Sequence, residues 1–455
     1  MSDPNLLVRY NIPTPRYTSY PTVPFWDKSI DPARWQASLT KTFSETNTGT
    51  GISLYLHLPF CESLCTYCGC NKKITTNHSV ESVYLSALLK EWKLYRSWMN
   101  ETPLIREMHL GGGTPTFFSA ANLEKLVSSI LREARVHPEA VFSIEGHPNN
   151  TTREQLKTLF RLGFRRISYG VQDHDPVVQR AINRIQPFEN VKRAASEARE
   201  TGYDSINFDL IYGLPFQMQE SMHNTVLQSI SLKPDRVAFY SYAHVPWTSR
   251  AQRLFDEHDL PGPAEKLKLY REGRELFRAH GYRDIGMDHF ALPGDELYLA
   301  WRAGTLHRNF MGYTIHPTRL LLGLGVSAIG DAGNAFAQNH KSLHDYYAAI
   351  REGKITPEKG YFLSPEDEIF RQYILDIGCR GKTIFSAEYR GPLEKYSFPE
   401  LQKLSADGLV VFDEHQAVVT TAGRDFIRHI CRAFDLHMLK SSKPMPGTPV
   451  YSKGI

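Results

Sequence analysis

The chain is predicted to be an α/β protein built around an incomplete barrel of six β/α repeats. Short apolar runs typical of buried strands recur along residues 51–243, and segments with apolar residues at helical spacing lie between them. Strands that alternate regularly with helices pair in parallel through helical crossovers. Six repeats fall short of the eight that close a complete barrel.

The expected elements follow this alternation, and several carry cap signals at their ends. Ser119 is placed to cap a helix, Thr151 and Glu154 form a capping box, and Gly202 stands just past a helix end. We expect strands at residues 53–58, 107–110, 141–145, 165–171, 205–212 and 236–243. We expect helices at residues 79–99, 119–135, 151–162, 187–201, 219–232 and 263–280, and then a strand at 282–288 that extends the sheet.

A chain of 455 residues exceeds the size at which one hydrophobic core usually stops growing, so more than one structural unit is expected. We expect an N-terminal arm over residues 1–50, a catalytic barrel with an extension over residues 51–350, and a mostly helical unit over residues 351–455. Prolines at positions 13, 15, 21 and 24 break any long element in the arm. The arm should therefore lie against a larger domain.

The C-terminal unit has a winged-helix-like pattern. Ser364, followed by a proline, marks a helix start; a helix, a turn and a β-hairpin are expected over residues 401–420, and a further helix over 421–438. A winged helix invites a DNA-binding interpretation, but the local charge is mixed, so a lid over the barrel mouth is favoured. Cys379 and Cys431 are expected to be small buried side chains.

The bulk composition excludes several classes of protein. Hydrophobic residues make up 41% of the chain and charged residues 22%, as in an ordinary soluble globular protein. The net charge of +4 comes without a clustered basic face, so no nucleic-acid partner is expected. No run of about 18 apolar residues predicts a membrane span. The N-terminus lacks a secretory signal, and a reducing cytoplasm would suit the free cysteines.

Four of the six cysteines lie in one loop after the first predicted strand. Cys61, Cys65 and Cys68 form a C-x3-C-x2-C pattern, and Cys70 follows. The loop is too short for these thiolates to diverge, and three converging thiolates suit a soft metal centre. A [4Fe–4S] cluster held by three cysteines leaves one iron open to a non-protein ligand. The alternatives are a zinc site that uses Cys70 or a nearby His as a fourth ligand, a disulfide, or buried inert cysteines.

Further polar or glycine-rich positions fall at the ends of the other predicted strands. In β/α barrels functional groups gather at the carboxyl ends of the strands. The cysteine loop follows the first strand and Gly111-Gly112-Gly113 the second, while Glu145, Gln172, Asp209 and Ala243 lie in or at the ends of the next four. This placement predicts one shared pocket.

The cysteine pattern, with Tyr67 before its last member, resembles that of the radical S-adenosylmethionine superfamily. Seven further segments narrow the resemblance to the family of oxygen-independent coproporphyrinogen III oxidases. They are Pro15-Arg-Tyr-Thr-Ser-Tyr-Pro21, Cys68-Gly-Cys-Asn71, Gly111-Gly-Gly-Thr-Pro-Thr116, Gly170-Val-Gln-Asp173, Asp209-Leu-Ile-Tyr-Gly-Leu-Pro215, Met287-Asp-His-Phe-Ala291 and Leu306-His-Arg-Asn-Phe310. They lie in the expected order.

The resemblance implies a set of cofactor-binding residues. Cys61, Cys65 and Cys68 would hold a [4Fe–4S] cluster whose open iron binds S-adenosylmethionine. This molecule would be contacted by Tyr55, Gly112, Glu145 and Ile329. A second molecule of S-adenosylmethionine would be surrounded by Tyr67, Gly113, Thr114, Gln172, Arg184, Asp209 and Ala243. Two departures from the family pattern are His147, where an Asp often stands, and Met311, where a Gln often stands.

The implied reaction converts two propionates of coproporphyrinogen III to vinyl groups, giving protoporphyrinogen IX in haem biosynthesis. Arg16 would orient a substrate carboxylate, Cys70 has an open role, and Asp288 and His289 are either core hydrogen-bond partners or catalytic residues. A flavodoxin or ferredoxin would donate electrons to a monomeric, cytoplasmic enzyme. The alternative functions are a related haem chaperone and a radical methyltransferase that processes haem.

Overall fold

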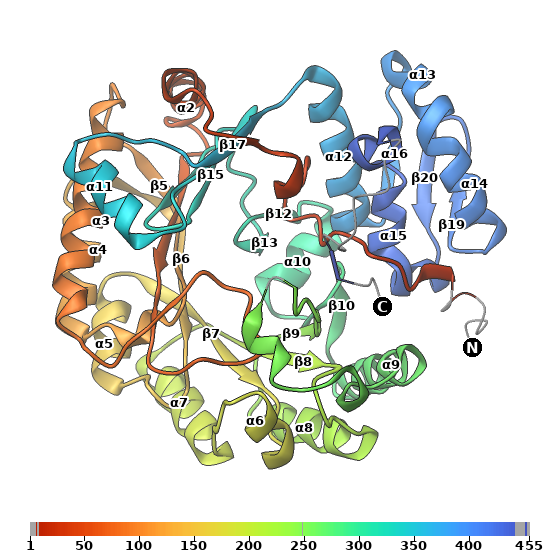
Figure 1. The fold of residues 1–455 in the computed structure, drawn as a ribbon, viewed down its shortest axis with the longest axis horizontal. Helices are drawn as coiled ribbons and strands as arrows, with labels where there is room; N and C mark the ends of the chain where they lie inside the picture. Colours follow the sequence, from red (N-terminus) through yellow and green to blue (C-terminus); the bar gives the residue numbers. More distant parts are fainter. Residues whose placement is uncertain (1–5, 7–8, 248, 442–450, 453–455) are drawn as a thin grey trace.

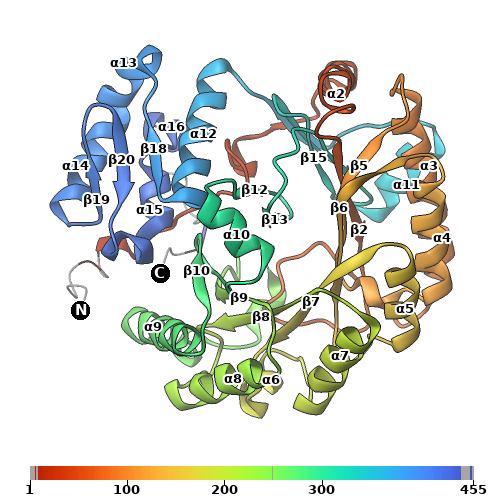
Figure 2. The same cartoon turned by 180° about the vertical axis from the view of Figure 1, so that it is seen from behind.

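The computed structural model describes residues 6, 9–247, 249–441 and 451–452, and one long curved sheet runs through its larger part (Figures 1 and 2). The six predicted strands are confirmed, and two of them start three or more residues earlier than expected. They are β2 (Ile52–Leu58), β5 (Leu104–Gly112), β6 (Arg135–Gly146), β7 (Phe164–Gln172), β8 (Ser205–Tyr212) and β9 (Arg236–Ser241). Each pairs in parallel with the next.

The helices that follow these strands in the sequence cover the outer face of the sheet (Figure 1). They are α3 (Val80–Ser97), α4 (Ala120–Leu131), α5 (Arg153–Arg161), α7 (Phe188–Thr201), α8 (Gln219–Ser231) and α9 (Pro263–Ala279). Leu54, Leu110 and Phe208 are fully buried in the resulting core. Towards the ends of β6 and β7 buried residues alternate with half-buried ones, because one face of the sheet packs against the helices and the other is partly open.

Two cap signals are confirmed, and one is wrong by a single residue. Ser119 caps α4, and Gly202 ends α7 in a left-handed conformation. The capping box of α5 is formed by Thr152 and Gln155 rather than by Thr151 and Glu154. Thr151 instead donates its hydroxyl to the carbonyl of His147, 2.9 Å away, and so stabilises the turn before the helix.

The sheet continues beyond the six repeats at both sides and stays open, with β1 and β10 as its edges. On one side lie the parallel strand β14 (Leu321–Leu324) and the antiparallel strands β15 (Ile329–Asp331), β16 (Ala335–Gln338), β17 (Lys359–Phe362) and β1 (Asp27–Lys28). On the other lie β11 (His289–Ala291) and β10 (Arg283–Ile285). The single strand predicted over 282–288 is therefore wrong in its extent, because Gly286 turns the chain at a φ of 60°.

The first 50 residues contain a long helix that the sequence reasoning did not anticipate. α2 (Pro32–Thr46) begins after the proline-rich stretch and is capped by Asp31. Its buried side chains Trp35, Leu39 and Phe43 belong to the core of the central sheet. The stretch before it is different, because Tyr10, Tyr17 and Tyr20 pack into a second core formed by the C-terminal unit.

That second core lies between α12 (Pro365–Arg380), α14 (Phe398–Ala406) and a three-stranded antiparallel sheet. The sheet has the strand order β18 (Lys382–Ile384), β20 (Gln416–Val419), β19 (Val410–Phe412). The predicted helix over 421–438 is wrong in its continuity. The segment forms a 3₁₀ turn at Ala422–Phe426, then α15 (Ile427–Arg432) and α16 (Leu436–Lys440), with Asp435 capping the last. Cys379 and Cys431 are buried, as predicted.

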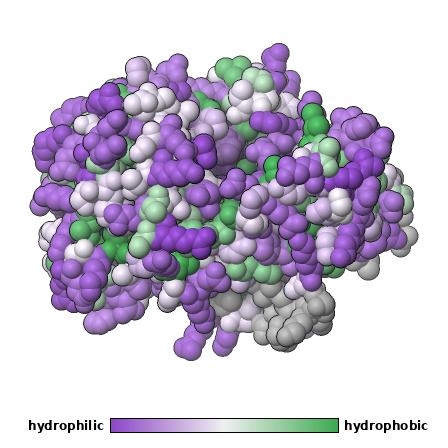
Figure 3. All heavy atoms as spheres, turned by 90° about the horizontal axis from the view of Figure 1, so that it is seen from above, coloured by the Kyte–Doolittle hydropathy of each residue, from purple (hydrophilic) through white to green (hydrophobic). Residues whose placement is uncertain are grey.

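The surface agrees with the composition. The face drawn in Figure 3 is mostly hydrophilic, with apolar side chains in small separate patches. Within the described residues no helix has the length and apolar character needed to cross a membrane.

Candidate active site

A cavity of about 830 Å³ opens at the carboxyl ends of the parallel strands. It collects side chains from the cysteine loop and from the ends of β5, β6, β7 and β8. The predicted site residues that line it are Cys61, Cys65, Tyr67, Cys68, Cys70, Gly112, Gly113, Thr114, Glu145, Gln172, Arg184 and Asp209. The single pocket predicted from strand ends is thus present.

The cysteine loop enters and leaves this cavity through two short paired strands, β3 (Phe60–Cys61) and β4 (Lys73–Ile74). Each sulfur has a polar neighbour from another part of the chain or from the loop. Cys61 Sγ lies 3.2 Å from the hydroxyl of Thr114, and Arg184 Nη1 donates to Cys65 Sγ over 3.6 Å. A hydrogen bond from the Cys70 thiol lowers the pKa of Cys68 to about 6.

The cysteines on this cavity are free thiols, as ligands of a cluster must be before it is assembled. All six cysteines are free, so no disulfide forms among them. Within the described part of the chain, no group of three or more His, Cys, Asp or Glu side chains is placed to hold one metal ion. A cubane cluster does not require donors around one centre, because each of its cysteines binds a different iron. Three thiols facing one roomy cavity meet that requirement.

The glycine turn at the end of β5, residues 111–113, lies so close to the cysteine loop that there is no room for side chains between them. A Cβ on Gly113 would lie 2.5 Å from the carbonyl oxygen of Pro59 and 3.1 Å from Cys61 Sγ. Gly112 has a φ of 121°, and a Cβ there would lie 2.9 Å from the His57 ring. The backbone can therefore approach a ligand closely at this corner.

Glu145 completes this corner of the cavity. Its carboxylate accepts hydrogen bonds from the backbone N–H of Gly112, at 3.1 Å, and from His109 Nε2, at 3.2 Å. Tyr55 lies outside the cavity lining but stacks on the His109 ring, with centroids 5.9 Å apart, and its hydroxyl lies 3.1 Å from His57 Nδ1. Tyr55 and Glu145 are thereby brought to the same side of the glycine turn.

A second polar group lines the cavity at the ends of β7 and β8. Arg184 donates to the carbonyl of Gly170 at 2.5 Å, and Gln172 stands beside it at a positive φ of 67°. Asp209 accepts hydrogen bonds from Ser168, at 3.0 Å, and from Asn207, at 2.8 Å. Burial, and then the nearby Glu145, raise the pKa of Asp209 to about 6.

Two further predicted residues, Ala243 and Ile329, do not line the cavity. Gln252 Nε2 donates to the carbonyls of Tyr67 and Ala243, each at 3.2 Å, and so links Ala243 to the cysteine loop. Ile329 lies in β15, where its backbone would contact a Cβ on Gly323. Gly323 in turn is paired with Tyr55 across the sheet.

The residues named as catalytic candidates are separated. Cys70 lines the main cavity, whereas His289 lines an adjoining chamber of about 170 Å³ that shares Glu145 and Asp209 with it. Asp288 Oδ1 lies 2.7 Å from His289 Nδ1, but Asp288 faces a third, smaller crevice together with Arg16.

Both departures from the family pattern lie at these cavities. His147 lines the main cavity, where burial lowers its pKa, and its Nδ1 accepts a hydrogen bond from the Asn149 N–H at 3.1 Å. Met311 lines the adjoining chamber.

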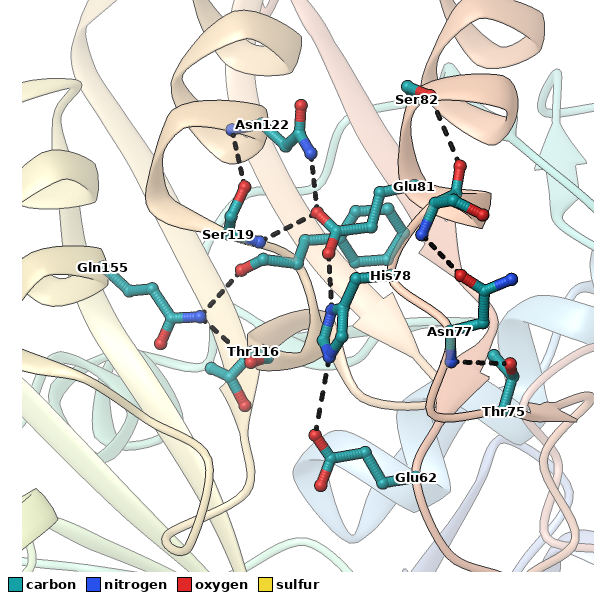
Figure 4. Close-up of polar contacts among 12 residues, drawn as sticks. Glu62, Thr75, Asn77, His78, Glu81, Ser82, Thr116, Ser119, Asn122 and Gln155 are labelled. Carbon is teal, nitrogen blue, oxygen red and sulfur yellow. Dashed lines mark hydrogen bonds and ion pairs between the residues drawn. The ribbon is translucent and has the colours of Figure 1, made fainter.

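Sequence reasoning missed His109 and the support behind the glycine turn. His109 is two residues before Gly111 on β5, so the alternation of side chains along a strand places it on the same face. The support is drawn in Figure 4: Glu81 accepts hydrogen bonds from the Ser119 N–H and from Asn122, while His78 Nδ1 lies 2.7 Å from its other oxygen. His78 also stacks on Phe117, with ring centroids 4.3 Å apart. This network anchors the helical turn that follows Thr114.

Comparison with known proteins places this geometry in a family. The model of the radical SAM superfamily matches residues 55–228. Oxygen-independent coproporphyrinogen III oxidases from Pseudomonas aeruginosa and Escherichia coli are each 38% identical to the chain, with 96% of both sequences covered. The chain belongs to the family of oxygen-independent coproporphyrinogen III oxidases. The coproporphyrinogen III oxidase family also includes a solved structure from Escherichia coli, described as a radical SAM enzyme, with a TM-score of 0.88, 36% identity, and 96% of this chain and 99% of that one covered.

Family membership confirms the resemblance and the fold predicted from the sequence. As a radical SAM protein, a coproporphyrinogen III oxidase uses a [4Fe–4S] cluster and S-adenosylmethionine. The three cysteines and the glycine turn on this cavity fit both groups.

Proposed function

We propose that the protein decarboxylates two propionate side chains of coproporphyrinogen III to vinyl groups without oxygen, giving protoporphyrinogen IX. The observation that carries this proposal is the placement of Cys61, Cys65 and Cys68 on one cavity beside the glycine turn, in a chain similar over nearly its whole length to coproporphyrinogen III oxidases. When bound, the cluster and S-adenosylmethionine would supply a 5′-deoxyadenosyl radical, which removes a hydrogen atom from a propionate.

The protein's own residues would bind and orient these groups. Cys61, Cys65 and Cys68 would each bind one iron. The exposed backbone of Gly112 and Gly113 would accommodate the amino acid part of S-adenosylmethionine, and the Glu145 carboxylate would accept hydrogen bonds from ribose hydroxyls. Glu145 is held for this by the Gly112 N–H and by His109.

A second molecule of S-adenosylmethionine is part of the proposal. The cavity of about 830 Å³ carries a second polar group away from the glycine turn. Arg184 would pair with a carboxylate there, and Asp209 with an ammonium or sulfonium group. Tyr67, Thr114 and Gln172 line the same space.

The proposal also covers the electron donor, the cellular compartment and the oligomeric state. The cluster requires a one-electron donor such as a flavodoxin or a ferredoxin. Thiolate ligands and free cysteines favour a reducing compartment, hence the cytoplasm. We also expect the enzyme to act as a monomer.

The test is a product assay. Protein reconstituted anaerobically with iron and sulfide is incubated with coproporphyrinogen III, S-adenosylmethionine and a reductant, and tetrapyrroles are resolved by mass. Loss of two CO2 equivalents per molecule is expected. An added methyl group would indicate a methyltransferase instead, and unchanged substrate with tightly retained haem would indicate a haem chaperone.

A further inference from the structure

A small crevice lies where the arm, the barrel and the C-terminal unit meet. Its volume is about 60 Å³. Arg16 comes from the arm, Asp288 from the turn between β10 and β11, and Arg424 and Arg428 from the C-terminal unit. The reaction described above leaves these two C-terminal arginines without a role.

The crevice carries an excess of positive charge. Three arginines line it, against Asp288 and Asp425. Asp425 already forms ion pairs with Arg271, at 3.0 Å, and with Arg274. Asp288 is bound by His289. Both acidic side chains are therefore engaged by groups that lie outside the lining, which favours an anionic ligand.

The arginines are held in place from both sides. Arg428 donates to the carbonyl of Pro15 at 3.2 Å and to that of Thr14, while Arg16 donates to the carbonyl of Ser241. Burial, and then the neighbouring Arg16, lower the pKa of Arg428 to about 10. Two guanidinium groups kept close together repel each other, and an anion between them would relieve that repulsion.

The crevice lies beside the catalytic cavity. The Arg16 guanidinium is 5.7 Å from the centroid of the Tyr240 ring, and Tyr240 lines the main cavity. The crevice has room for about four to six water molecules, counting about 10–15 Å³ of this volume for each. Leu267, Met287 and Ile427 add apolar wall. The space therefore suits the end of a carboxylate arm.

We propose that this crevice binds one of the substrate propionates that is not being decarboxylated, with Arg424 and Arg428 as its anchoring residues. The inference rests on the proposed function. Guanidinium groups bind carboxylates through paired, charge-assisted hydrogen bonds. The C-terminal unit would thus contribute directly to substrate recognition, and a tetrapyrrole at the cavity mouth would have one arm in the cavity and another in the crevice.

The test measures binding of coproporphyrin III, the oxidised analogue with the same carboxylates, and of its tetramethyl ester. Fluorescence titrations compare the reconstituted wild type with Arg424→Gln, Arg424→Lys and Arg428→Gln, and Arg390→Gln serves as an exposed control in the same unit, where it pairs with Glu394 and Glu414. Losing a charged hydrogen bond should weaken coproporphyrin III binding about tenfold or more. Arg424→Lys should retain part of the affinity, and Arg390→Gln all of it.

Two further comparisons make the result decisive. The ester should bind equally weakly to the wild type and to every variant. If a variant loses affinity for the acid and for the ester to the same extent, packing rather than a carboxylate contact was lost, and the proposal is overturned. Because Arg428 also holds the arm, Arg424→Gln is the deciding variant: Arg424 is exposed, and its guanidinium lies 5.8 Å from the Trp301 ring.

The experiment distinguishes failure of the crevice proposal from failure of the proposed function. If the wild type converts coproporphyrinogen III and Arg424→Gln binds coproporphyrin III as tightly as the wild type, only the crevice proposal is overturned. If the wild type neither converts coproporphyrinogen III nor binds coproporphyrin III, both are overturned.

Discussion

Cys65 is the most enclosed of the three predicted cluster ligands, with 9% of its surface exposed. Replacing Cys65 with Ser removes one thiolate while keeping the size of the side chain. We expect the Cys65→Ser protein to lose its iron and its ability to cleave S-adenosylmethionine, as measured by iron analysis and 5′-deoxyadenosine formation. Cys431→Ala is the matched control, because Cys431 is buried in the second core, and it should keep both. Cleavage by the Cys65→Ser protein would contradict the ligand assignment.

Asp209 should make binding of the proposed second S-adenosylmethionine depend on pH. Its pKa is raised to about 6, so the carboxylate is ionised above pH 6 and increasingly neutral below it. A cationic ligand bound by this carboxylate should therefore bind more weakly as the pH falls from 7.5 to 5. Calorimetric titrations across this range should show the second binding event weakening roughly tenfold, the scale of a charge-assisted hydrogen bond. The Asp209→Asn protein should bind weakly at every pH; a wild-type profile from it would remove Asp209 from the site.

At the scale of single elements, the glycine turn after β5 determines how closely the cysteine loop is held. A Cβ at position 113 would meet the backbone of Pro59 at 2.5 Å, and backbone does not yield as a flexible side chain does. Gly113→Ala should displace the loop and lower the iron and sulfide content severalfold after reconstitution. Gly49→Ala, with nothing within 4 Å of the added carbon, should leave both unchanged. Wild-type iron and sulfide content in the Gly113→Ala protein would show that the glycine turn does not hold the cysteine loop in place.

The elements also show where sequence reasoning succeeded. The six parallel strands could be predicted because each is a run of apolar residues followed by a glycine or polar signal. The cap of α5 could not be assigned with certainty, because Thr151 and Thr152 are each followed three residues later by a Glu or a Gln. The hydrogen bond from Thr151 to the carbonyl of His147, in the turn before the helix, leaves Thr152 to cap it. Strands such as β15, three residues long, carry too little pattern to be predicted.

The same limit applies to the site. The residues at strand ends could be predicted to meet, because parallel strands end together. The positions of Arg424 and Arg428 could not be predicted. These residues reach the barrel from a separate unit, more than 170 residues after β9 begins, and no local sequence pattern encodes that packing. Asp288 and His289 are adjacent in sequence, yet they line different cavities because neighbouring residues of an extended segment point to opposite sides.

At the scale of the whole molecule, the arm joins the two cores. Tyr20 is 1% exposed, its hydroxyl accepts a hydrogen bond from the Leu436 N–H at 3.1 Å, and it belongs to the second core. Tyr20→Ala should destabilise the C-terminal unit by roughly 3–5 kcal/mol, the cost of truncating a buried aromatic side chain. Hydrogen exchange should accelerate in α12 and α15 and remain slow in β2 and β5.

Phe216→Ala is the control for this experiment, since Phe216 is 45% exposed. It should change neither region. Uniform acceleration across both cores in Tyr20→Ala would mean that the molecule unfolds as one unit, contrary to this account of the arm.

The central claim is that three thiolates in one cavity hold a cluster and leave one iron for S-adenosylmethionine. The most direct measurement is the metal and acid-labile sulfide content of protein purified without air. The account predicts about four irons and about four sulfides per chain, as in a [4Fe–4S] cluster. Protein that contains zinc and no sulfide would contradict it.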